Sequence, residues 1–160
     1  MIEILEMRDD EMYDLLRRIG YGHLACSEAD QPYVVPIYFA YDGDQIFIYT
    51  TAGKKSEAMN TNPKICLQVE EFLSNSMWKS VIVTGEAYKI ADPRERESAV
   101  DLIRKKNPSF MPALAIKWSN DWIRKNVEAI FRIKITSMTG RMSSEVRITA
   151  AGAQPLFCDR

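Results

Sequence analysis

Alternation of apolar and polar residues with a period of two dominates this chain and predicts a largely β structure. The clearest pair of strands flanks Asp42-Gly43-Asp44, because an Asp-Gly pair between runs of β-branched and aromatic residues is a strong β-hairpin signal. Gly85, partway along a later apolar run, indicates a bulge or bend of the kind that barrels need. Six strands are expected, at residues 21–27, 31–41, 45–51, 64–70, 78–90 and 127–136.

Helical spacing appears near the start of the chain. Apolar residues recur at i, i+3, i+4 and i+7 from Met12 to Ile19, with Asp9 or Asp10 as a cap and Gly20 placed to end the helix. This helix is expected to cover one side of a barrel by packing.

Two further helices are marked by their ends. Asp92-Pro93-Arg94-Glu95 combines a capping Asp, a Pro at the first helical position and a Glu placed to complete a capping box. The basic run Arg104-Lys105-Lys106 falls in the last turn, where positive charge is favoured, and Asn107-Pro108 ends this helix. A shorter helix is expected from Lys54 to about Thr61, before Asn62-Pro63.

The remaining stretches predict less regular structure. Residues 71–77 are polar and are expected to form a loop, and Thr139-Gly140-Arg141 to form a turn. Trp118 and Trp122, spaced i, i+4 between residues 110 and 126, are more typical of packing, although one could lie against a cofactor ring. We expect a single domain over residues 1–160, with a loose C-terminal tail from about residue 142.

Charge and composition exclude several classes of site. A formal net charge of −1 gives no electrostatic reason to expect nucleic acid or a membrane surface as a partner, and no apolar span or secretory leader is evident. His23 is the one histidine, and the three cysteines are scattered, so neither a metal site nor a disulfide framework is expected. A reducing, cytoplasmic setting fits this cysteine content. Cys66 is interpreted as a small core residue and His23 as structural.

Lys54 and Lys55 are the first anomaly, because two cations in a first helical turn oppose the helix dipole. A bound phosphate would reverse that penalty, using free backbone N–H groups together with both ammonium groups. The alternative is a pair of solvated surface lysines.

Pro36 is the second anomaly, because proline cannot donate to a β-ladder and in mid-strand implies an edge, a bulge or an open face. A partly unpaired strand could offer backbone groups to a flat ligand. The alternative is an ordinary solvated edge strand.

These features occur in one ordered set: a proline-containing strand, Tyr49-Thr50, Lys54-Lys55, Asn62-Pro63, and Ser80-Val81 four residues before Gly85. In this order the chain resembles the FMN-binding split barrels related to pyridoxamine 5′-phosphate oxidase, and within them the branch that contains the nitroimidazole-resistance reductases. The resemblance is good over residues 20–90 and looser elsewhere. It implies a mainly β (α+β) fold, a six-stranded split β-barrel with peripheral helices.

The resemblance also implies a cofactor and a site. FMN would bind at a homodimer interface, with the strand 34–39 along the isoalloxazine ring and ribityl chain, both lysines on the phosphate, and residues 78–83 approaching from the other subunit. The implied cofactor-binding residues are Val34, Val35, Pro36, Ile37, Tyr38, Phe39, Tyr49, Thr50, Thr51, Lys54, Lys55, Trp78, Ser80 and Val81.

Departures from the family pattern limit the activity that can be expected. The oxidase has Arg-Lys as its phosphate pair and a basic residue where this chain has Phe39, so oxidation of pyridoxamine phosphate is not expected. A histidine common in the nitroimidazole-resistance branch is replaced by Tyr49, which argues against nitro-group reduction. An FMN-dependent oxidoreductase of unknown substrate, with no catalytic acid or base identified, is the main hypothesis. A flavin or deazaflavin binding or sensor protein without turnover is the alternative.

Overall fold

The computed structural model describes residues 2–107, 128–147 and 154–155. Along the chain the elements are β1 (Ile2–Glu6), α1 (Asp9–Arg18), β2 (Tyr21–Glu28), β3 (Gln31–Tyr41), β4 (Ile46–Thr51), α2 (Lys54–Thr61), β5 (Lys64–Ser74), β6 (Met77–Lys89), α3 (Pro93–Lys106), β7 (Glu128–Arg147) and β8 (Gln154–Pro155). The segment with Trp118 and Trp122 lies outside the described residues, as do Val127 and Cys158.

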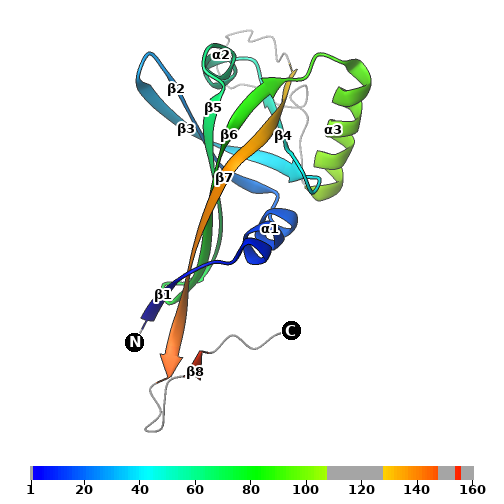
Figure 1. Ribbon diagram of the computed structural model, residues 1–160. Helices are drawn as coiled ribbons and strands as arrows, with labels where there is room; N and C mark the ends of the chain where they lie inside the picture. Colours follow the sequence, from blue (N-terminus) through cyan, green and yellow to red (C-terminus); the bar gives the residue numbers. More distant parts are fainter. Residues whose placement is uncertain (1, 108–127, 148–153, 156–160) are drawn as a thin grey trace, which may run out of the picture.

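Six antiparallel strands close into a ring, which confirms the expected barrel. Neighbours follow the order β7-β4-β3-β2-β5-β6, and β6 pairs with β7 to complete the circle. β1 and β8 add to the far end of β7, which runs the length of the molecule (Figure 1). The register of β6 against β7 shifts between Thr84 and Gly85, so the expected bulge is present.

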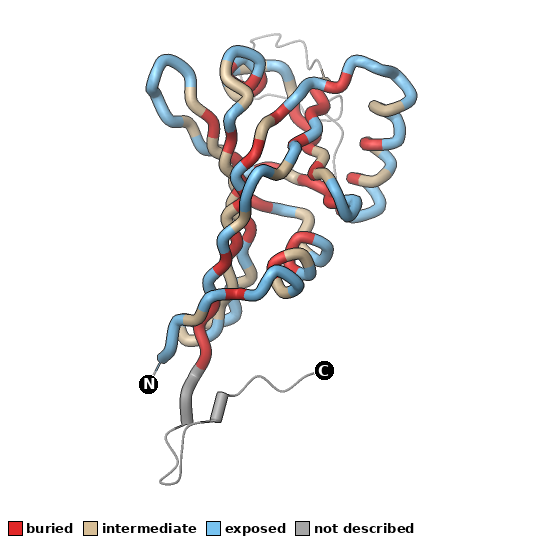
Figure 2. The backbone as a smooth tube through the Cα atoms, viewed as in Figure 1, coloured by how far each residue is buried: buried red, intermediate tan, exposed pale blue. Residues whose placement is uncertain are grey.

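Inward-facing apolar side chains fill the barrel. Buried positions alternate with exposed ones along the strands (Figure 2), as the period of two requires. Leu24, Phe39, Ile48, Leu67 and Phe131 are each fully buried in one cluster, to which α1 adds its apolar face. A second cluster lies between α3 and the outer sides of β3, β4 and β7, so β4 is covered on both faces.

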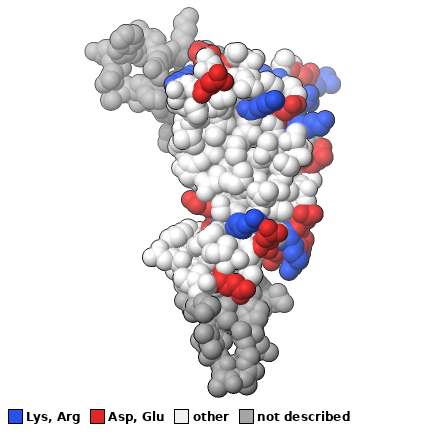
Figure 3. Space-filling view, turned by 60° about the vertical axis from the view of Figure 1, so that its left-hand side comes forward, with Lys and Arg blue, Asp and Glu red and all other residues white. Residues whose placement is uncertain are grey.

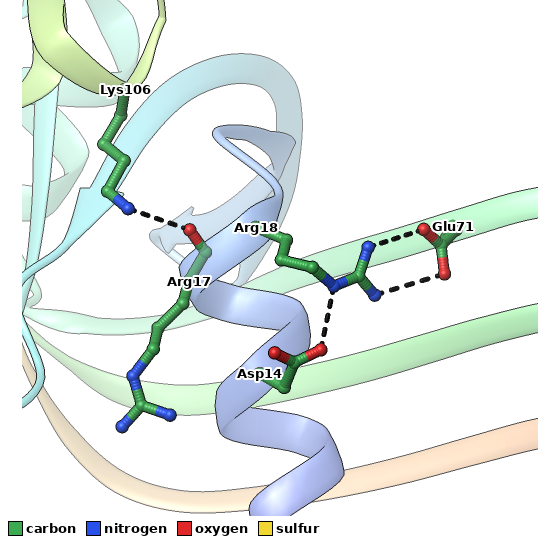
Figure 4. A network of polar contacts seen from close by, with 5 residues as sticks. All are labelled: Asp14, Arg17, Arg18, Glu71 and Lys106. Atoms are coloured by element: carbon green, nitrogen blue, oxygen red, sulfur yellow. Dashed lines mark hydrogen bonds and ion pairs between the residues drawn. The ribbon is translucent and has the colours of Figure 1, made fainter. Parts of the chain in front are cut away.

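Polar contacts fix α1 against the rest of the fold (Figure 4). The Arg18 guanidinium donates to both Glu71 oxygens, at 2.8 and 3.3 Å, and to Asp14 at 2.8 Å. Hydrogen bonds from Arg18 hold the pKa of the Glu71 carboxyl below its ordinary value. From α3, the Lys106 ammonium donates to the Arg17 carbonyl at 3.1 Å. These contacts tie α1 to β5 and to the end of α3.

Helix ends are predicted well by local signals, with one correction. Asp92 caps α3 by accepting from the Glu95 N–H at 2.8 Å, as expected. α1, however, already includes Asp9 and Asp10 in its first turn, and Arg8 precedes it. The Glu11 carboxylate accepts from the Arg8 N–H at 2.9 Å, so a side chain inside the helix satisfies the N–H of the residue that precedes it.

Two irregular segments were predicted wrongly, since both are strand. β5 continues to Ser74 and meets β6 at a tight turn, which replaces the loop expected at residues 71–77. β7 passes straight through Thr139-Gly140-Arg141 and ends at Arg147, beyond the expected start of the tail. A Cβ on Gly140 would lie 2.8 Å from Met7 Cβ and Met12 Cγ, so this glycine serves close packing of α1 and not a turn.

No helix in the described part of the chain has both the length and the apolar character needed to cross a membrane.

Candidate functional site

The first turn of α2 brings Lys54 and Lys55 together at one end of the barrel. Gly53 precedes the helix with a φ of 157°, which L side chains rarely adopt. The buried Ser56 hydroxyl accepts from the Gly53 N–H and donates to the Gly53 carbonyl, both at 2.8 Å. This exchange fixes the entry of the chain into α2, and with it the placement of the two lysines.

The two lysine side chains have different surroundings. Lys54 is exposed, and its ammonium lies 4.7 Å from the centre of the Tyr33 ring, a cation–π contact. Lys55 is half-buried, and burial lowers the pKa of its ammonium. Among the described residues no carboxylate forms an ion pair with either lysine. Two neighbouring cations without an ion-paired carboxylate, although Glu57 lies in the same turn, make this end of α2 suited to an anion.

Cys26 faces the barrel interior near the two lysines. Burial raises the pKa of its thiol, while the nearby Lys55 ammonium acts in the opposite direction. Cys26 is opposite Tyr33 in the β2–β3 ladder, which explains how the thiol, the ring and the lysines come together.

An opening between β3 and β4 runs beside these lysines. β4 pairs with β3 only from Phe39 to Tyr41, whereas β3 pairs with β2 from Gln31 to Tyr38. The Phe39 N–H bonds to the Gly20 carbonyl at 2.9 Å, which makes this a hydrogen-bonded pair. Backbone bonding alternates in an antiparallel ladder, so the backbone groups of Val34, Pro36 and Tyr38 point toward the opening. Pro36 therefore lies on an edge, as predicted, and its missing N–H costs no ladder bond.

The outer face of β2, β3, β5 and β6 has no Lys, Arg, Asp or Glu at the neighbouring positions His23, Pro36, Gln68 and Ile82, and the exposed Glu70, which accepts from the Gln68 amide at 3.0 Å, borders it. His23 lies opposite Pro36 on one side and Gln68 on the other, and Gln68 lies opposite Ile82. The Tyr21 ring packs edge-on against His23 and Tyr38, each at 5.8 Å. Figure 3, viewed from the side of the β2–β3 hairpin, shows a broad face without charged side chains. No helix of the described chain is seen to cover it (Figure 1).

The structure separates the predicted cofactor-binding residues by the direction of their side chains. Val34, with 63% of its surface exposed, faces outward, and Pro36, Tyr38 and Ser80 are at outward positions too. The others on these strands face the barrel interior, so only their backbone could touch a ligand: Val35, Ile37, Phe39 and Val81. Trp78 is half-buried, and its backbone N–H donates to the Ser143 hydroxyl at 3.1 Å.

Tyr49 and Thr50 face opposite sides of β4. Tyr49 packs under α3, with 8% of its surface exposed, and its hydroxyl donates to the Glu128 carboxylate at 2.5 Å. Thr50 is buried on the other side of the strand, and Thr51 is half-buried next to α2. The Tyr49 ring is therefore not beside the Lys54–Lys55 pair, and sequence alternation missed this because β4 is apolar on both faces.

Sequence reasoning also missed Tyr33, Cys26 and Glu128. The hairpin register would have placed Tyr33 opposite Cys26, but only the packing of α2 against β2 brings Lys54 to the ring. Within the described residues no group of three or more His, Cys, Asp or Glu side chains could hold a metal ion.

Comparisons with known proteins agree with this fold. The family model described as pyridoxamine 5′-phosphate oxidase matches residues 8–142. An uncharacterized protein of Rhizobium meliloti (strain 1021) is 35% identical over 139 residues, which cover 84% of this chain and 92% of that protein.

Two solved structures are similar over most of the chain. A FAD-binding protein from Mesorhizobium loti superposes with a TM-score of 0.72 at 30% identity, covering 91% of this chain and all of that one. A candidate 5-nitroimidazole antibiotic resistance protein from Bacteroides thetaiotaomicron shares the fold, with a TM-score of 0.68, 17% identity and coverage of 91% and 92%. The closed six-stranded ring, the family match and these likenesses together show that this chain belongs to the pyridoxamine 5′-phosphate oxidase family of split barrels.

Proposed function

We propose that this chain is an FMN-binding protein of the cytoplasm that acts as a homodimer and uses the flavin as a redox centre for a small-molecule substrate. The observation that carries the proposal is the Lys54–Lys55 pair, which lies at a helix N-terminus beside an open strand edge and has no ion pair with a described carboxylate. The Mesorhizobium loti protein, 30% identical, is described as FAD-binding, which supports a flavin as the ligand class.

The lysine pair would hold the FMN phosphate. Burial of Lys55 disfavours its charged form, and a dianionic phosphate would offset that cost while accepting hydrogen bonds from the first turn of α2. Lys54 would keep its contact with Tyr33 or exchange it for the phosphate. Once bound, the flavin supplies hydride or electron transfer, and the protein supplies binding and orientation.

The open edge of β3 would receive the flavin ring. Backbone groups of Val34, Pro36 and Tyr38 point into the opening, where donors and acceptors of the ring's pyrimidine edge could pair with them. Ser80 lies on the same outer face of the sheet.

A second copy would cover the uncharged outer face. Exposed apolar side chains there include Val34 and Tyr21, with 63% and 46% of their surfaces exposed. Obligate dimers bury on the order of 2,000 Å² or more, and burial of such a face would supply the driving force. In this arrangement residues 78–83 of the partner approach the flavin, so both copies build the site.

One observation favours a second candidate, a flavin or deazaflavin binding or sensor protein without turnover. Tyr49 stands where the nitroimidazole-resistance branch commonly has a histidine, and its hydroxyl is directed to Glu128 under α3. No acid or base is thereby supplied to the opening from this position. The absorption spectrum of the purified protein distinguishes FMN from a deazaflavin, and anaerobic reduction by NADH or NADPH distinguishes an enzyme from a binding protein.

Isothermal titration with FMN and riboflavin tests the phosphate site. Each lost charged contact costs about 1.5–3 kcal/mol, so we expect each Lys→Ala change at Lys54 or Lys55 to weaken FMN binding about 10- to 100-fold. Riboflavin lacks the phosphate and should bind the wild type and the Lys54→Ala/Lys55→Ala variant equally.

The matched control is the Lys64→Ala/Lys89→Ala variant, which removes two exposed lysines from β5 and β6 and should bind FMN normally. Unchanged FMN affinity in the Lys54→Ala/Lys55→Ala variant would refute the phosphate site. A flavin-loaded protein that sediments as a monomer at micromolar concentration would refute the shared site.

A further inference from the structure

A pocket lies away from the β3–β4 opening, at the other end of β4. Its volume is about 310 Å³, within the lower range of small-ligand sites. The β3–β4 turn and the outer sides of β6 and β7 line it, through Asp44, Gln45, Tyr88, Arg132, Lys134 and Ile135. β4 ends in the turn before α2, so its whole length separates this pocket from Lys54 and Lys55.

Each acidic group in or beside this pocket already has a polar partner. Asp44 accepts from the Gln45 amide at 3.3 Å. Glu86 accepts from the Tyr88 hydroxyl, and Glu95 pairs with Arg132 at 3.0 Å. The acceptors around the pocket are thus engaged by neighbouring side chains.

The N–H donors of Lys134 and Arg132 are engaged less fully than these acceptors. Lys134 is exposed and forms no ion pair or hydrogen bond with a described side chain, although Glu86 lies opposite it in the ladder. The Arg132 guanidinium has five N–H donors, and its ion pair with Glu95 uses one nitrogen. This excess of donors suits a ligand that carries an acceptor with negative charge.

Tyr88 and Ile135 supply the apolar part of the lining. Tyr88 exposes 43% of its surface, and its hydroxyl is turned to Glu86, so its ring remains available for stacking. Ile135 is half-buried and adds an aliphatic wall. A ligand that matches both the cationic donors and the apolar part of the lining has a small planar body and one acidic group.

We propose that this pocket binds a small aromatic carboxylate, with the carboxylate on Lys134 and Arg132 and the ring against Tyr88 and Ile135. Glu86 and Glu95 reduce the local positive potential, so the pocket selects by hydrogen-bond geometry and ring contact more than by long-range charge. The site is independent of the flavin proposal, because none of its residues lies at the β3–β4 opening.

Titration of the purified protein with benzoate, followed by backbone amide NMR, tests the proposal. We expect shifts at Asp44, Gln45, Tyr88 and Lys134, and none at Lys54 or Lys55. Benzamide has the same shape without the charge and should bind at least about tenfold more weakly, as expected for loss of one charged contact. Equal binding of benzoate and benzamide, or shifts confined to other parts of the protein, would overturn the proposal.

Two lysine variants sharpen the test. Lys134→Gln removes the charge and keeps a polar side chain at this exposed position, and we expect it to weaken benzoate binding at least about tenfold. Lys64→Gln, on β5, is the matched control and should leave binding unchanged. Unchanged benzoate affinity in Lys134→Gln would exclude the pocket as the binding site, whether or not benzoate binds elsewhere.

Discussion

The α1 side and the α2 side of the barrel differ in how their charges are compensated. On the α1 side, Arg18 forms ion pairs with Asp14 and Glu71, and the apolar face of the helix packs against the core. On the α2 side, Lys54 and Lys55 share a helix turn with no described acid paired to them, beside a strand edge that β4 pairs with only from Phe39 to Tyr41. The difference separates a region whose charges are paired within the fold from the region that we propose binds a ligand.

The largest expected effect is on the α1 side, where Leu15 is fully buried. Leu15→Ala removes apolar contacts and leaves a cavity, so it should lower the free energy of unfolding by about 2–5 kcal/mol. Urea unfolding measures this change. Leu73→Ala, the same substitution at a side chain with 67% of its surface exposed, should cost less than about 0.5 kcal/mol. Equal costs for the two variants would contradict the placement of α1 in the core.

A smaller effect is expected from the ion pair that joins α1 to β5. Because the pKa of the Glu71 carboxyl is lowered in the folded protein, its contribution to stability is present above the unfolded pKa of about 4.5 and is lost as the pH falls through the folded value. The pair is partly exposed, with 43% and 26% of the two side chains accessible, so the contribution is less than about 1 kcal/mol.

Urea unfolding between pH 3 and 7 detects this contribution, because Glu71→Gln should flatten the fall in stability below about pH 4.5. Glu97→Gln, at an exposed position on α3 with no ion pair among the described residues, is the control and should retain the wild-type pH dependence. Identical pH profiles for the wild type and Glu71→Gln would show that the pair does not stabilise the fold.

The smallest effect on stability is expected on the α2 side. In flavin-free protein, Lys54→Ala/Lys55→Ala should change the free energy of unfolding by less than about 0.5 kcal/mol, and removal of cations from a first helical turn favours a slight gain. Thermal unfolding without and with saturating FMN checks this, since the variant should lose the flavin-dependent rise in melting temperature. A large loss of stability without flavin would mean that the lysines are structural.

Local signals were reliable wherever neighbouring residues decide the outcome. The Asp42-Gly43 hairpin turn, the Asp92 cap and the span of α2 follow from turn chemistry, capping and the placement of Gly and Pro, all of which act within a few residues. The irregular register at Gly85 was also visible in the sequence. The lysine pair and the open edge at Pro36 could be predicted because each violates a local rule.

Contacts between distant parts of the chain decided the features that local patterns did not predict. β7 extends through a small, polar stretch because β6 and β1 pair with its two edges, and Gly140 makes room there for Met7 and Met12. Tyr49 turns away from the lysines because α3 offers an apolar surface on the outer side of β4.

The sequence by itself determined the strand periodicity, the helix ends and the two cations that oppose a helix dipole, since these depend on covalent geometry and nearest neighbours. Only the tertiary structure decided which side of each strand is buried, where β3 parts from β4, and that Tyr33 lies under Lys54. Closing a sheet into a barrel fixes the register of strands far apart in sequence, and no local pattern contains that information.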